Sequence, residues 1–516
     1  MDGSMTQCVF SGSPLRLFNS LSRQIEEFVP MDPAQARIYS CGPTVYNYAH
    51  IGNLRAYVFT DTLRRTLNWK GLAVKHVINI TDVGHLTSDQ DEGEDKMEMA
   101  SKTMERDIWQ IADHFTRAFK DDLAQLNVWH PTLWSTATDH IQEMIAFGQT
   151  LEKAGVTYEL ETGLYFDTSR VANYGALASA SLAGQAEGAR VERIEGKRNP
   201  SDFAIWRRSP AIGKRQMEWL SPWGPGAPGW HLECSVMSLK YLGAPFDIHT
   251  GGIDHREIHH CNEIAQNQAC TGRDHPGANL WMHNNFLIDR SGKMSKSKGE
   301  FATLTSLIRR GLHPLAFRLL CLSTHYRSEL EFSVEILAGQ LARLKRLVGA
   351  VAALQLKVEN ASWKRIPREV VYSSGASLSY PRQVLEASLP PEGDRIITAF
   401  DRELAEDLMT PRLLPLLDET LNHPRLSPEV KLRLVASMDL VLGLKLLDVH
   451  RSDLSLRPEN ASLTENEVLA SLTQRQEARK NKEFTIADQI RQQLHAAGIE
   501  LMDGQEPAWE WRPFLL

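Results

Sequence analysis

Short apolar runs alternate with amphipathic stretches in the first part of the chain. One apolar run ends at Ile38-Tyr39-Ser40, and after a turn the apolar positions between Leu54 and Leu67 recur at helical spacing. Over residues 38–130 the order strand, glycine turn, helix repeats, which is typical of a doubly wound parallel sheet. The pattern therefore predicts an α/β fold that binds its ligand where the strand order reverses.

The hydrophobic period changes after residue 130. A predicted helix near Asp139–Ala154 and strand-like residues 157–158 and 164–166 interrupt the alternation, which resumes with a strand at 246–248. From about residue 314 the period is 3.6, which predicts a helical region. Its expected helices cover 331–357, 394–408, 413–421, 428–447 and 464–497, and the stretch 358–392, rich in Ser, Pro and Gly, is expected to be a surface loop.

These changes of pattern divide the chain into five expected parts. They are the first half of a catalytic α/β domain (1–130), an insertion (131–220), the second half of the domain (221–313), a helical domain (314–460) and a C-terminal segment (461–516).

Composition narrows the class of protein. The 516 residues hold no run of eighteen apolar residues and no leader pattern at the N-terminus, so we expect a cytoplasmic protein without a membrane partner. Six cysteines are too few for a disulfide scaffold in a chain of this length. The net charge of −7 limits nucleic-acid binding to local basic faces. Because the sequence has no heptad run, we expect a monomer. Whether translation begins at Met1 or Met5 stays open.

Two segments carry phosphate chemistry. His50, Gly52 and Asn53 lie where a strand turns into a helix, and free N–H groups at a helix N-terminus bind phosphate oxygens. His50 and Asn53 can donate hydrogen bonds to charge that develops on a transferring phosphoryl group. Lys293 and Lys296, in the segment Lys-Met-Ser-Lys-Ser at 293–297, would add positive charge near bound ATP with Mg²⁺.

Together the two segments resemble the paired signatures of class I aminoacyl-tRNA synthetases. Either segment alone is common by chance, but their order and wide separation match that class. The resemblance implies a Rossmann-like doubly wound parallel sheet, a connective insertion at 131–220 and a helical anticodon-binding domain.

A second constellation consists of thiol, imidazole and carboxylate groups. Cys41 precedes the first segment, Cys234 ends Pro-Gly-Trp-His-Leu-Glu-Cys, and His259 and Glu263 are four residues apart, on one face of a predicted helix. Such a set suits one tetrahedral Zn²⁺, and a thiol substrate would bind that ion as a thiolate, whereas the hydroxyl of serine is a poor ligand. The spacing alone is weak, because an isolated His-x-x-x-Glu is usually an exposed pair.

The chain also resembles cysteinyl-tRNA synthetases over nearly its whole length. The matching segments are 41–46, 50–53, 79–82, 228–231, 246–249, 251–254, 259–260, 262–263 and 293–297. The resemblance implies the reaction of that family, in which L-cysteine and ATP form cysteinyl-adenylate and the cysteine passes to the 3′ end of tRNA(Cys). It also implies roles for individual residues: Cys41, Cys234, His259 and Glu263 hold zinc; Gly42, Thr44 and Trp230 contact cysteine; His50, Gly52, Asn53, Gly251, Gly252, Asp254 and Lys296 contact ATP; and His50, Asn53, Lys293 and Lys296 act in catalysis.

Two departures suggest a variant branch of the family. Cys261 replaces the glutamate usual at that position, and helix geometry predicts that it points away from His259 and Glu263, although a swap in ligation stays open. Residues 83–95 replace a more usual Asp- and Lys-rich turn. A shifted substrate or acceptor is therefore an open alternative.

The C-terminal segment carries the expected tRNA contacts: Arg479, Lys482, Trp509, Trp511 and Arg512. Ordinary packing of the two tryptophans is an equal alternative. Two other functions compete with the synthetase: a cysteine ligase that acts on a non-tRNA amine, and a non-enzymatic paralogue that binds tRNA or cysteine. The match of the C-terminal segment opposes the first, and the intact ATP signatures oppose the second.

Overall fold

The protein is described from a computed structural model. The structure describes residues 12–84, 96–104, 106–178, 196–210, 216–272, 274–289, 302–358, 379–502 and 509–515. Lys293, Lys296, both candidate start positions and most of the unusual stretch 83–95 lie outside these ranges. In the described part of the chain, no helix combines the length and apolar character needed to cross a membrane.

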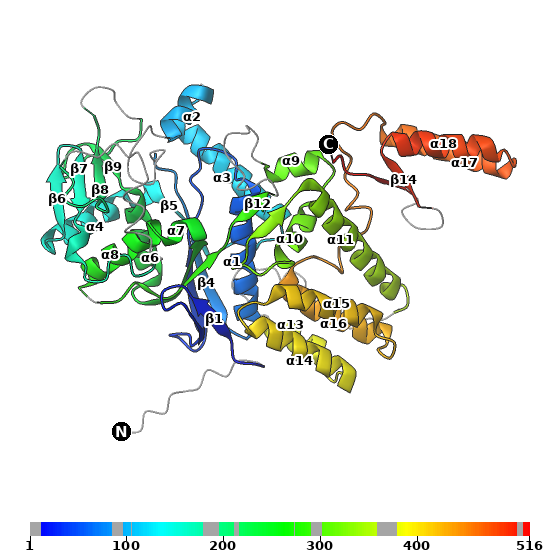
Figure 1. Cartoon of the computed structure of the whole chain (residues 1–516), viewed down its shortest axis with the longest axis horizontal. Helices are drawn as coiled ribbons and strands as arrows, with labels where there is room; N and C mark the ends of the chain where they lie inside the picture. The colour runs from blue at the N-terminus through cyan, green and yellow to red at the C-terminus, as the bar shows by residue number, and fades with distance from the viewer. Residues whose placement is uncertain are drawn as a thin grey trace.

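A five-stranded parallel sheet forms the centre of the N-terminal half, in the order β11-β10-β3-β4-β5 (Figure 1). The strands are β3 (Gln35–Ser40), β4 (Ala73–Ile80), β5 (Leu133–Thr136), β10 (Phe246–Gly252) and β11 (Ala278–Asn284). In chain order, β4 and β5 follow on one side of β3, whereas β10 and β11 lie on its other side. The direction in which strands are added to the sheet therefore reverses between β3 and β10. This arrangement confirms the predicted doubly wound sheet.

Six helices connect and flank these strands. They are α1 (Ile51–Trp69), α2 (Lys96–Met104), α3 (Ile108–Gln125), α6 (Trp230–Leu242), α7 (Ile253–Arg256) and α8 (His259–Thr271). α1 starts at residue 51 because the His50 side chain accepts the N–H of Asn53 and caps the helix. Most residues of its 19-residue length are buried, so α1 lies inside the molecule and not on its surface.

Between β5 and α6 the chain forms an antiparallel sheet of four strands, in the order β6-β7-β8-β9. The elements of this region are η1 (Ala137–His140), α4 (Ile141–Lys153), β6 (Thr157–Leu160), β7 (Gly163–Phe166), η2 (Thr168–Arg170), β8 (Phe203–Arg208) and β9 (Gly226–Pro228). The predicted helix and both predicted strands are confirmed. The sheet continues to β9, beyond the expected end at residue 220, because β9 pairs with β8.

Helices make up most of the second half of the chain. In the described residues up to position 442 they are α9 (Leu304–Arg309), α10 (Pro314–Leu322), α11 (Val334–Gln355), α13 (Ser379–Glu386), α14 (Pro391–Ala405), α15 (Thr410–Asn422) and α16 (Pro428–Leu442). A short parallel pair, β12 (Leu287–Asp289) with β13 (Leu330–Phe332), lies beside them, and near the N-terminus β1 (Arg16–Asn19) pairs with β2 (Gln24–Glu27). One buried apolar cluster runs from the parallel sheet through α1 into these helices. The two halves therefore share a core.

The prediction of a surface loop over 358–392 is wrong where the structure describes it, because α13 lies within that range. Few apolar residues mark this helix. Its contact with the core comes from Leu385, which is buried, and from Arg382, whose guanidinium lies 4.1 Å from the centre of the Trp69 ring. A cation–π contact of this kind leaves no hydrophobic period in the sequence. Residues 359–378 of the predicted loop lie outside the described ranges.

The single long helix predicted over 464–497 is also wrong. The chain forms two helices, α17 (Glu465–Lys480) and α18 (Phe484–Ala496), because Asn481 ends the first and Lys482 has a φ of 63°. That backbone conformation cannot continue a right-handed helix. The two helices and the strand pair β14 (Ile499–Leu501) with β15 (Trp509–Trp511) form a small C-terminal unit at the edge of the molecule (Figure 1).

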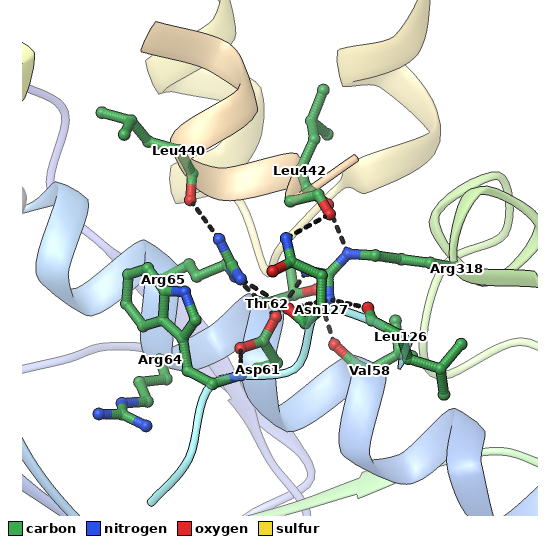
Figure 2. A network of polar contacts seen from close by, with 12 residues as sticks. Val58, Asp61, Thr62, Arg64, Arg65, Leu126, Asn127, Arg318, Leu440 and Leu442 are labelled. Carbon is green, nitrogen blue, oxygen red and sulfur yellow. Dashed lines mark hydrogen bonds and ion pairs between the residues drawn. The ribbon is translucent and has the colours of Figure 1, made fainter. Parts of the chain in front are cut away.

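Asp61, in the middle of α1, is the centre of a buried polar junction between the two halves (Figure 2). Its Oδ2 atom accepts hydrogen bonds of 2.6 Å from both Arg65 and Arg318, and its Oδ1 accepts the N–H of Trp129. The side chains of Asp61, Arg65 and Arg318 are 0% exposed. Burial opposes ionisation of Asp61, but the two guanidinium charges outweigh burial and lower its pKa.

The two arginines extend this junction to α16. Arg65 donates to the carbonyl oxygen of Leu440 at 3.0 Å, and Arg318 donates to that of Leu442 at 2.7 Å (Figure 2). Both also donate to the carbonyl oxygen of Asn127, which follows α3. One carboxylate thus fixes α1, α10, α16 and the end of α3 relative to one another.

Two more buried carboxylates join the same halves. Asp401 on α14 accepts hydrogen bonds from Lys70, at 2.6 Å, and from the indole of Trp69, at 3.1 Å. Asp407 accepts the N–H of Phe18 on β1 at 2.9 Å and hydrogen bonds from Tyr326 and Arg327, both at 2.7 Å. Because a buried carboxylate without partners is costly, Asp401 specifies how α14 docks at the end of α1, and Asp407 fixes the chain after α14 relative to β1.

We predict that Asp61→Asn lowers the free energy of unfolding by about 3–5 kcal/mol, because it leaves two buried guanidinium groups without a counter-charge. Urea denaturation followed by circular dichroism measures the change. Asp113→Asn is the matched control, since Asp113 also pairs with an arginine four residues later, but the side chains of that pair are 61% and 72% exposed. The control should change stability by no more than about 0.5–1 kcal/mol. Equal effects of the two variants would contradict the importance of the buried junction.

Candidate functional site

The loop that follows β3 is hydrogen-bonded to the end of β4. Gly42 donates its N–H to the side-chain oxygen of Asn79 at 2.7 Å, and Cys41 donates its N–H to the carbonyl oxygen of Thr250 on β10. A Cβ at Gly42 would lie 1.5 Å from the carbonyl oxygen of Asn79. Only glycine therefore lets the chain pass this close, and the close passage fixes Cys41 at the switch point of the sheet.

The four predicted metal ligands come together at that point. Cys41 follows β3, Cys234 lies on α6, and His259 and Glu263 lie on α8; one potential ligand atom from each is within 4.8 Å of all the others. All four are buried. His259 Nε2 is 3.0 Å from Glu263 Oε1, as expected for residues four apart on one helix face. The structure thus brings together residues that are up to 222 positions apart in the sequence.

Cys261 points away from this cluster. Its Sγ donates a hydrogen bond to the carbonyl oxygen of Arg256 at 3.4 Å. Cys261 is also absent from both groups of side chains in the described residues that are spaced to hold a metal ion. This geometry agrees with the orientation predicted from the helix.

Three buried histidines, His249, His260 and His283, surround the cluster, and the sequence analysis gave none of them a role. His249 Nε2 is 2.9 Å from Glu263 Oε2, and His260 Nε2 is 3.3 Å from Cys41 Sγ. His260 Nδ1 in turn bonds His283 Nε2 at 2.7 Å. Together with Cys41 and Glu263, His249 and His260 form a second group of four potential ligands. The sequence offers only weak signals for these histidines: His260 is adjacent to His259, and His249 directly follows the predicted strand 246–248.

Electrostatics within the cluster favour ionised Glu263. Burial opposes that charge, but the nearby imidazoles of His249 and His259 outweigh burial and lower the pKa of Glu263 to about 2. Burial likewise opposes the positive charge of His259, yet the charges of Glu263 and Cys234 raise its pKa to about 10. The two groups therefore form a buried ion pair at neutral pH.

The two thiols of the cluster have different proton affinities. A hydrogen bond from Cys41 lowers the pKa of Cys234 to about 7 despite burial. Burial and the hydrogen bond to Cys234 raise the pKa of Cys41. One thiolate thus forms readily at neutral pH, and the other thiol retains its proton until a cation displaces it.

A chain of hydrogen bonds connects the Cys41 loop to the helix that carries Cys234. The amide of Asn79, whose oxygen holds Gly42, donates to Thr81 Oγ1 at 3.0 Å, and Thr81 donates to Glu233 at 2.9 Å. Thr81 also pairs through its backbone with Thr44. Burial raises the pKa of Glu233 to about 8, so its carboxyl group is mostly neutral at pH 7.

Trp230, the first residue of α6, lies beside the cluster. Its ring centre is 4.4 Å from that of His259 and 5.9 Å from that of His255. Gly251, the second-last residue of β10, packs against His260, whose Cε1 atom would be 2.7 Å from a Cβ at position 251. An aromatic wall and close-packed glycine backbone therefore border the cluster.

The predicted ATP residues that the structure describes lie at the start of α1 and the end of β10. His50 caps α1 through Nδ1, which accepts the N–H of Asn53 at 3.3 Å, and a Cβ at Gly52 would lie 2.9 Å from that same Nδ1 atom. Gly252 is the residue before α7, whose first turn contains Asp254. Since β3 and β10 are neighbours, both groups face the switch point of the sheet.

The predicted tRNA residues lie in the C-terminal unit, but in different surroundings. Trp511 is buried in the small core that includes Val468 and Leu494. Arg512 bonds the Nε2 atom of His495 at 3.0 Å. Arg479 lies in the last turn of α17, Lys482 lies between α17 and α18, and Trp509 is half-buried. Packing therefore accounts for Trp511.

Comparisons with known proteins identify the family to which this fold and this site belong. A family model for the "tRNA synthetases class I (C) catalytic domain" matches residues 27–341. The cysteine–tRNA ligase of Zymomonas mobilis subsp. mobilis is 60% identical over 510 residues, which cover 97% of this chain and 98% of that protein. That of Novosphingobium aromaticivorans is 54% identical and covers 97% of each chain. The chain belongs to the cysteine–tRNA ligase family.

The fold has wider relatives among solved structures. The methionyl-tRNA synthetase of Mycobacterium tuberculosis, solved with methionyl-adenylate bound, aligns with a TM-score of 0.50 at 14% identity, covering 79% of this chain and 90% of that one. At this identity the likeness concerns the fold alone. Membership of the cysteine–tRNA ligase family makes the protein an aminoacyl-tRNA synthetase, with an amino acid, ATP and tRNA as substrates.

We predict that Gly42→Ala displaces the Cys41 loop, because the new Cβ would overlap the carbonyl oxygen of Asn79. The metal content of the purified protein should fall well below that of the parent chain, and stability should fall by about 1–3 kcal/mol. Metal analysis and urea denaturation measure these effects. Gly339→Ala, on α11 with no other atom within 4 Å of its Cβ, should keep the metal and gain up to about 1 kcal/mol. An unchanged metal content in Gly42→Ala would disprove the predicted displacement.

Proposed function

We propose that this protein activates L-cysteine with ATP and transfers it to tRNA(Cys). The observation that supports this function is the convergence of Cys41, Cys234, His259 and Glu263 at the switch point of the parallel sheet, close to the capped N-terminus of α1. A cysteine side chain bound at the cluster would bring its carboxylate toward a nucleotide at α1. No observation favours a non-tRNA amine as acceptor or a purely binding role.

The cluster fits one Zn²⁺ per chain. The cluster offers two sulfur atoms, one imidazole nitrogen and one carboxylate oxygen. Such a donor set binds Zn²⁺ in preference to harder cations such as Mg²⁺. When bound, the ion would supply a Lewis acid that holds a substrate thiolate. Serine offers a hydroxyl that keeps its proton and binds zinc poorly, so the same site would reject it. Trp230, Gly42 and Thr44 are proposed to enclose the amino acid.

Adenylate formation needs positive charge and hydrogen-bond donors near the α-phosphate of ATP. We assign this role to His50 and Asn53 at the N-terminus of α1, with Gly52 allowing close approach of the backbone. Gly251, Gly252 and Asp254 are assigned to ATP binding at the end of β10. Lys293 and Lys296 are assigned to the same step from the sequence alone, with Mg²⁺ on the phosphates. The carboxylate of cysteine is already ionised, so no general base is required.

Transfer to tRNA is proposed to use the C-terminal unit for the anticodon. Arg479, Lys482 and Trp509, with Arg512, offer cations and one half-buried ring for unpaired bases. We propose a monomer with five parts, which are the catalytic halves 1–130 and 221–313, the connective insertion 131–220, the helical domain 314–460 and the anticodon segment 461–516.

Binding of Zn²⁺ at pH 7 should release about two protons or more per ion, because the ligands must lose their protons. His259 and Cys41, whose pKa values are both raised, each lose one, and Cys234, whose pKa is lowered, adds only the part of its thiol that is still protonated. Glu263, with a pKa of about 2, contributes none. Zinc affinity should therefore rise with pH.

Calorimetry in buffers of different ionisation enthalpy measures this proton release. Cys261→Ser is the control, since its sulfur bonds Arg256 and not the cluster, and it should release the same number of protons. Release of one proton or fewer, or a changed number in Cys261→Ser, would contradict the proposed ligand set.

Attachment of radioactive cysteine to purified tRNA tests the function directly. We expect charging of tRNA with the cysteine anticodon, no detectable charging with serine, and loss of charging by the Cys234→Ala variant, which removes a thiolate ligand. Cysteine-dependent pyrophosphate exchange without tRNA charging would reject the proposed acceptor, and absence of both activities would reject the enzyme.

A further inference from the structure

Glu510, in the middle of β15, is a buried carboxylate that joins the C-terminal unit to the helical part of the chain. Its neighbours Trp509 and Trp511 pack into the small core of the unit. Because successive side chains of a strand point to opposite sides, Glu510 faces away from that core. It is nevertheless only 5% exposed. A carboxylate in such a place is costly to bury unless another part of the molecule supplies its partners.

Two cations from different parts of the helical domain bind this carboxylate. Lys345 on α11 donates to its Oε2 atom at 2.8 Å, and Arg451, in the chain after α16, donates to its Oε1 atom at 2.5 Å. The side chains of Lys345 and Glu510 are 9% and 6% exposed, so solvent and salt screen their attraction little. One carboxylate therefore holds β15 against both α11 and the chain that follows α16.

Backbone hydrogen bonds attach the chain at both ends of the unit to the end of α9. Glu459, before the unit, donates its N–H to the carbonyl oxygen of Arg309 at 2.7 Å, and Phe514, after β15, donates its N–H to that of Arg310 at 2.8 Å. Among the described residues, the apolar core of the unit is separate from the large core of the molecule. The angle of the unit therefore depends on polar contacts such as those of Glu510.

The unit is long, and two of the predicted tRNA residues lie at its far end. α17 begins at Glu465, close to the joint, and its 16 residues span about 24 Å at 1.5 Å per residue. Arg479 lies in its last turn, and Lys482 follows it. Figure 1 shows α17 and α18 extending away from the rest of the molecule. A tilt of about 10° at the joint would therefore move these two cations by about 4 Å.

We propose that Glu510 is a positioning residue for tRNA, because it sets the angle at which the C-terminal unit leaves α11. The proposal rests on the function proposed above, in which this unit binds the anticodon. Each oxygen of the carboxylate bonds a cation on a different segment, so the plane of the group is fixed relative to both segments. Activation of cysteine takes place at the parallel sheet and does not depend on this angle.

Glu510→Gln and Lys345→Met test this role, since each weakens the ion pair and keeps the backbone hydrogen bonds of the joint. In both variants we expect the KM for tRNA in charging to rise by at least about tenfold, because contacts displaced by more than about 1 Å are lost. Cysteine-dependent pyrophosphate exchange, which needs no tRNA, should keep its kcat and its KM for ATP within about twofold. Small-angle X-ray scattering of the free proteins should show a changed distribution of interatomic distances in both variants.

Glu459→Gln is the matched control. Its carboxylate also pairs with an arginine at this joint, Arg309 at 3.7 Å, but the side chains of Glu459 and Arg309 are 68% and 64% exposed. It should leave both the scattering and the KM for tRNA unchanged. An unchanged KM for tRNA in Glu510→Gln, an equal rise in Glu459→Gln, or parallel losses in charging and in pyrophosphate exchange would overturn the proposal. If the parent chain does not charge tRNA, the proposed function fails, while an unchanged scattering profile of Glu510→Gln would separately overturn the role of Glu510.

Discussion

The buried ion pair of Asp61 with Arg65 and Arg318 is the constraint on which the rest of the structure depends. It lies in the middle of α1, whose N-terminal turn carries His50 and Asn53 and whose last turn is tied to Asp401 through Trp69 and Lys70. The charges cannot separate without leaving an unpaired ion in an apolar core, which would cost several kcal/mol. The helix is therefore held along its whole length, and a group placed at its first turn has a fixed position relative to both halves of the molecule.

The candidate site combines the switch point of a parallel sheet with a buried cluster of potential metal ligands. The parallel sheet brings the ends of β3 and β10 together, which creates a place for a nucleotide. Beside it, Cys41, Cys234, His259 and Glu263 form a buried cluster, and His249, His260 and Trp230 pack around these residues. Hydrogen bonds through Asn79 and Thr81 to Glu233 hold the two cysteine-bearing segments at a fixed separation. In the proposed function, selectivity would come from the bond between a metal in this cluster and the substrate sulfur, so the chemistry would not require a second proofreading site.

Sequence patterns predicted the elements whose apolar periods are long and uninterrupted, such as β3, α1 and α11, and the resemblance named the four cluster residues before any geometry was known. The patterns failed where a single residue decides the outcome. Lys482, with its positive φ, divides the predicted helix into α17 and α18, and Arg382 attaches α13 to Trp69 without an apolar stripe. His249, His260 and Asp61 escaped notice for another reason, since each bonds a partner at least 14 residues away in the sequence, which is Glu263, Cys41 and Arg318, respectively. Conversely, helix geometry alone was sufficient to orient Cys261 away from Glu263.

The pairing of β3 with β10 has a consequence for how the protein is made. Ser40 and Thr250, which bond each other at 2.7 Å across these strands, are 210 residues apart. At about 5–20 residues per second, the ribosome needs roughly 10–40 s to synthesise the intervening chain. During that interval β3 and β4 can pair with each other, but one edge of β3 has no partner, and unpaired apolar edges favour aggregation. The strand pairing that builds the site can thus form only after β3, β4 and β5 have all been synthesised, and the free edge of β3 needs protection until β10 emerges.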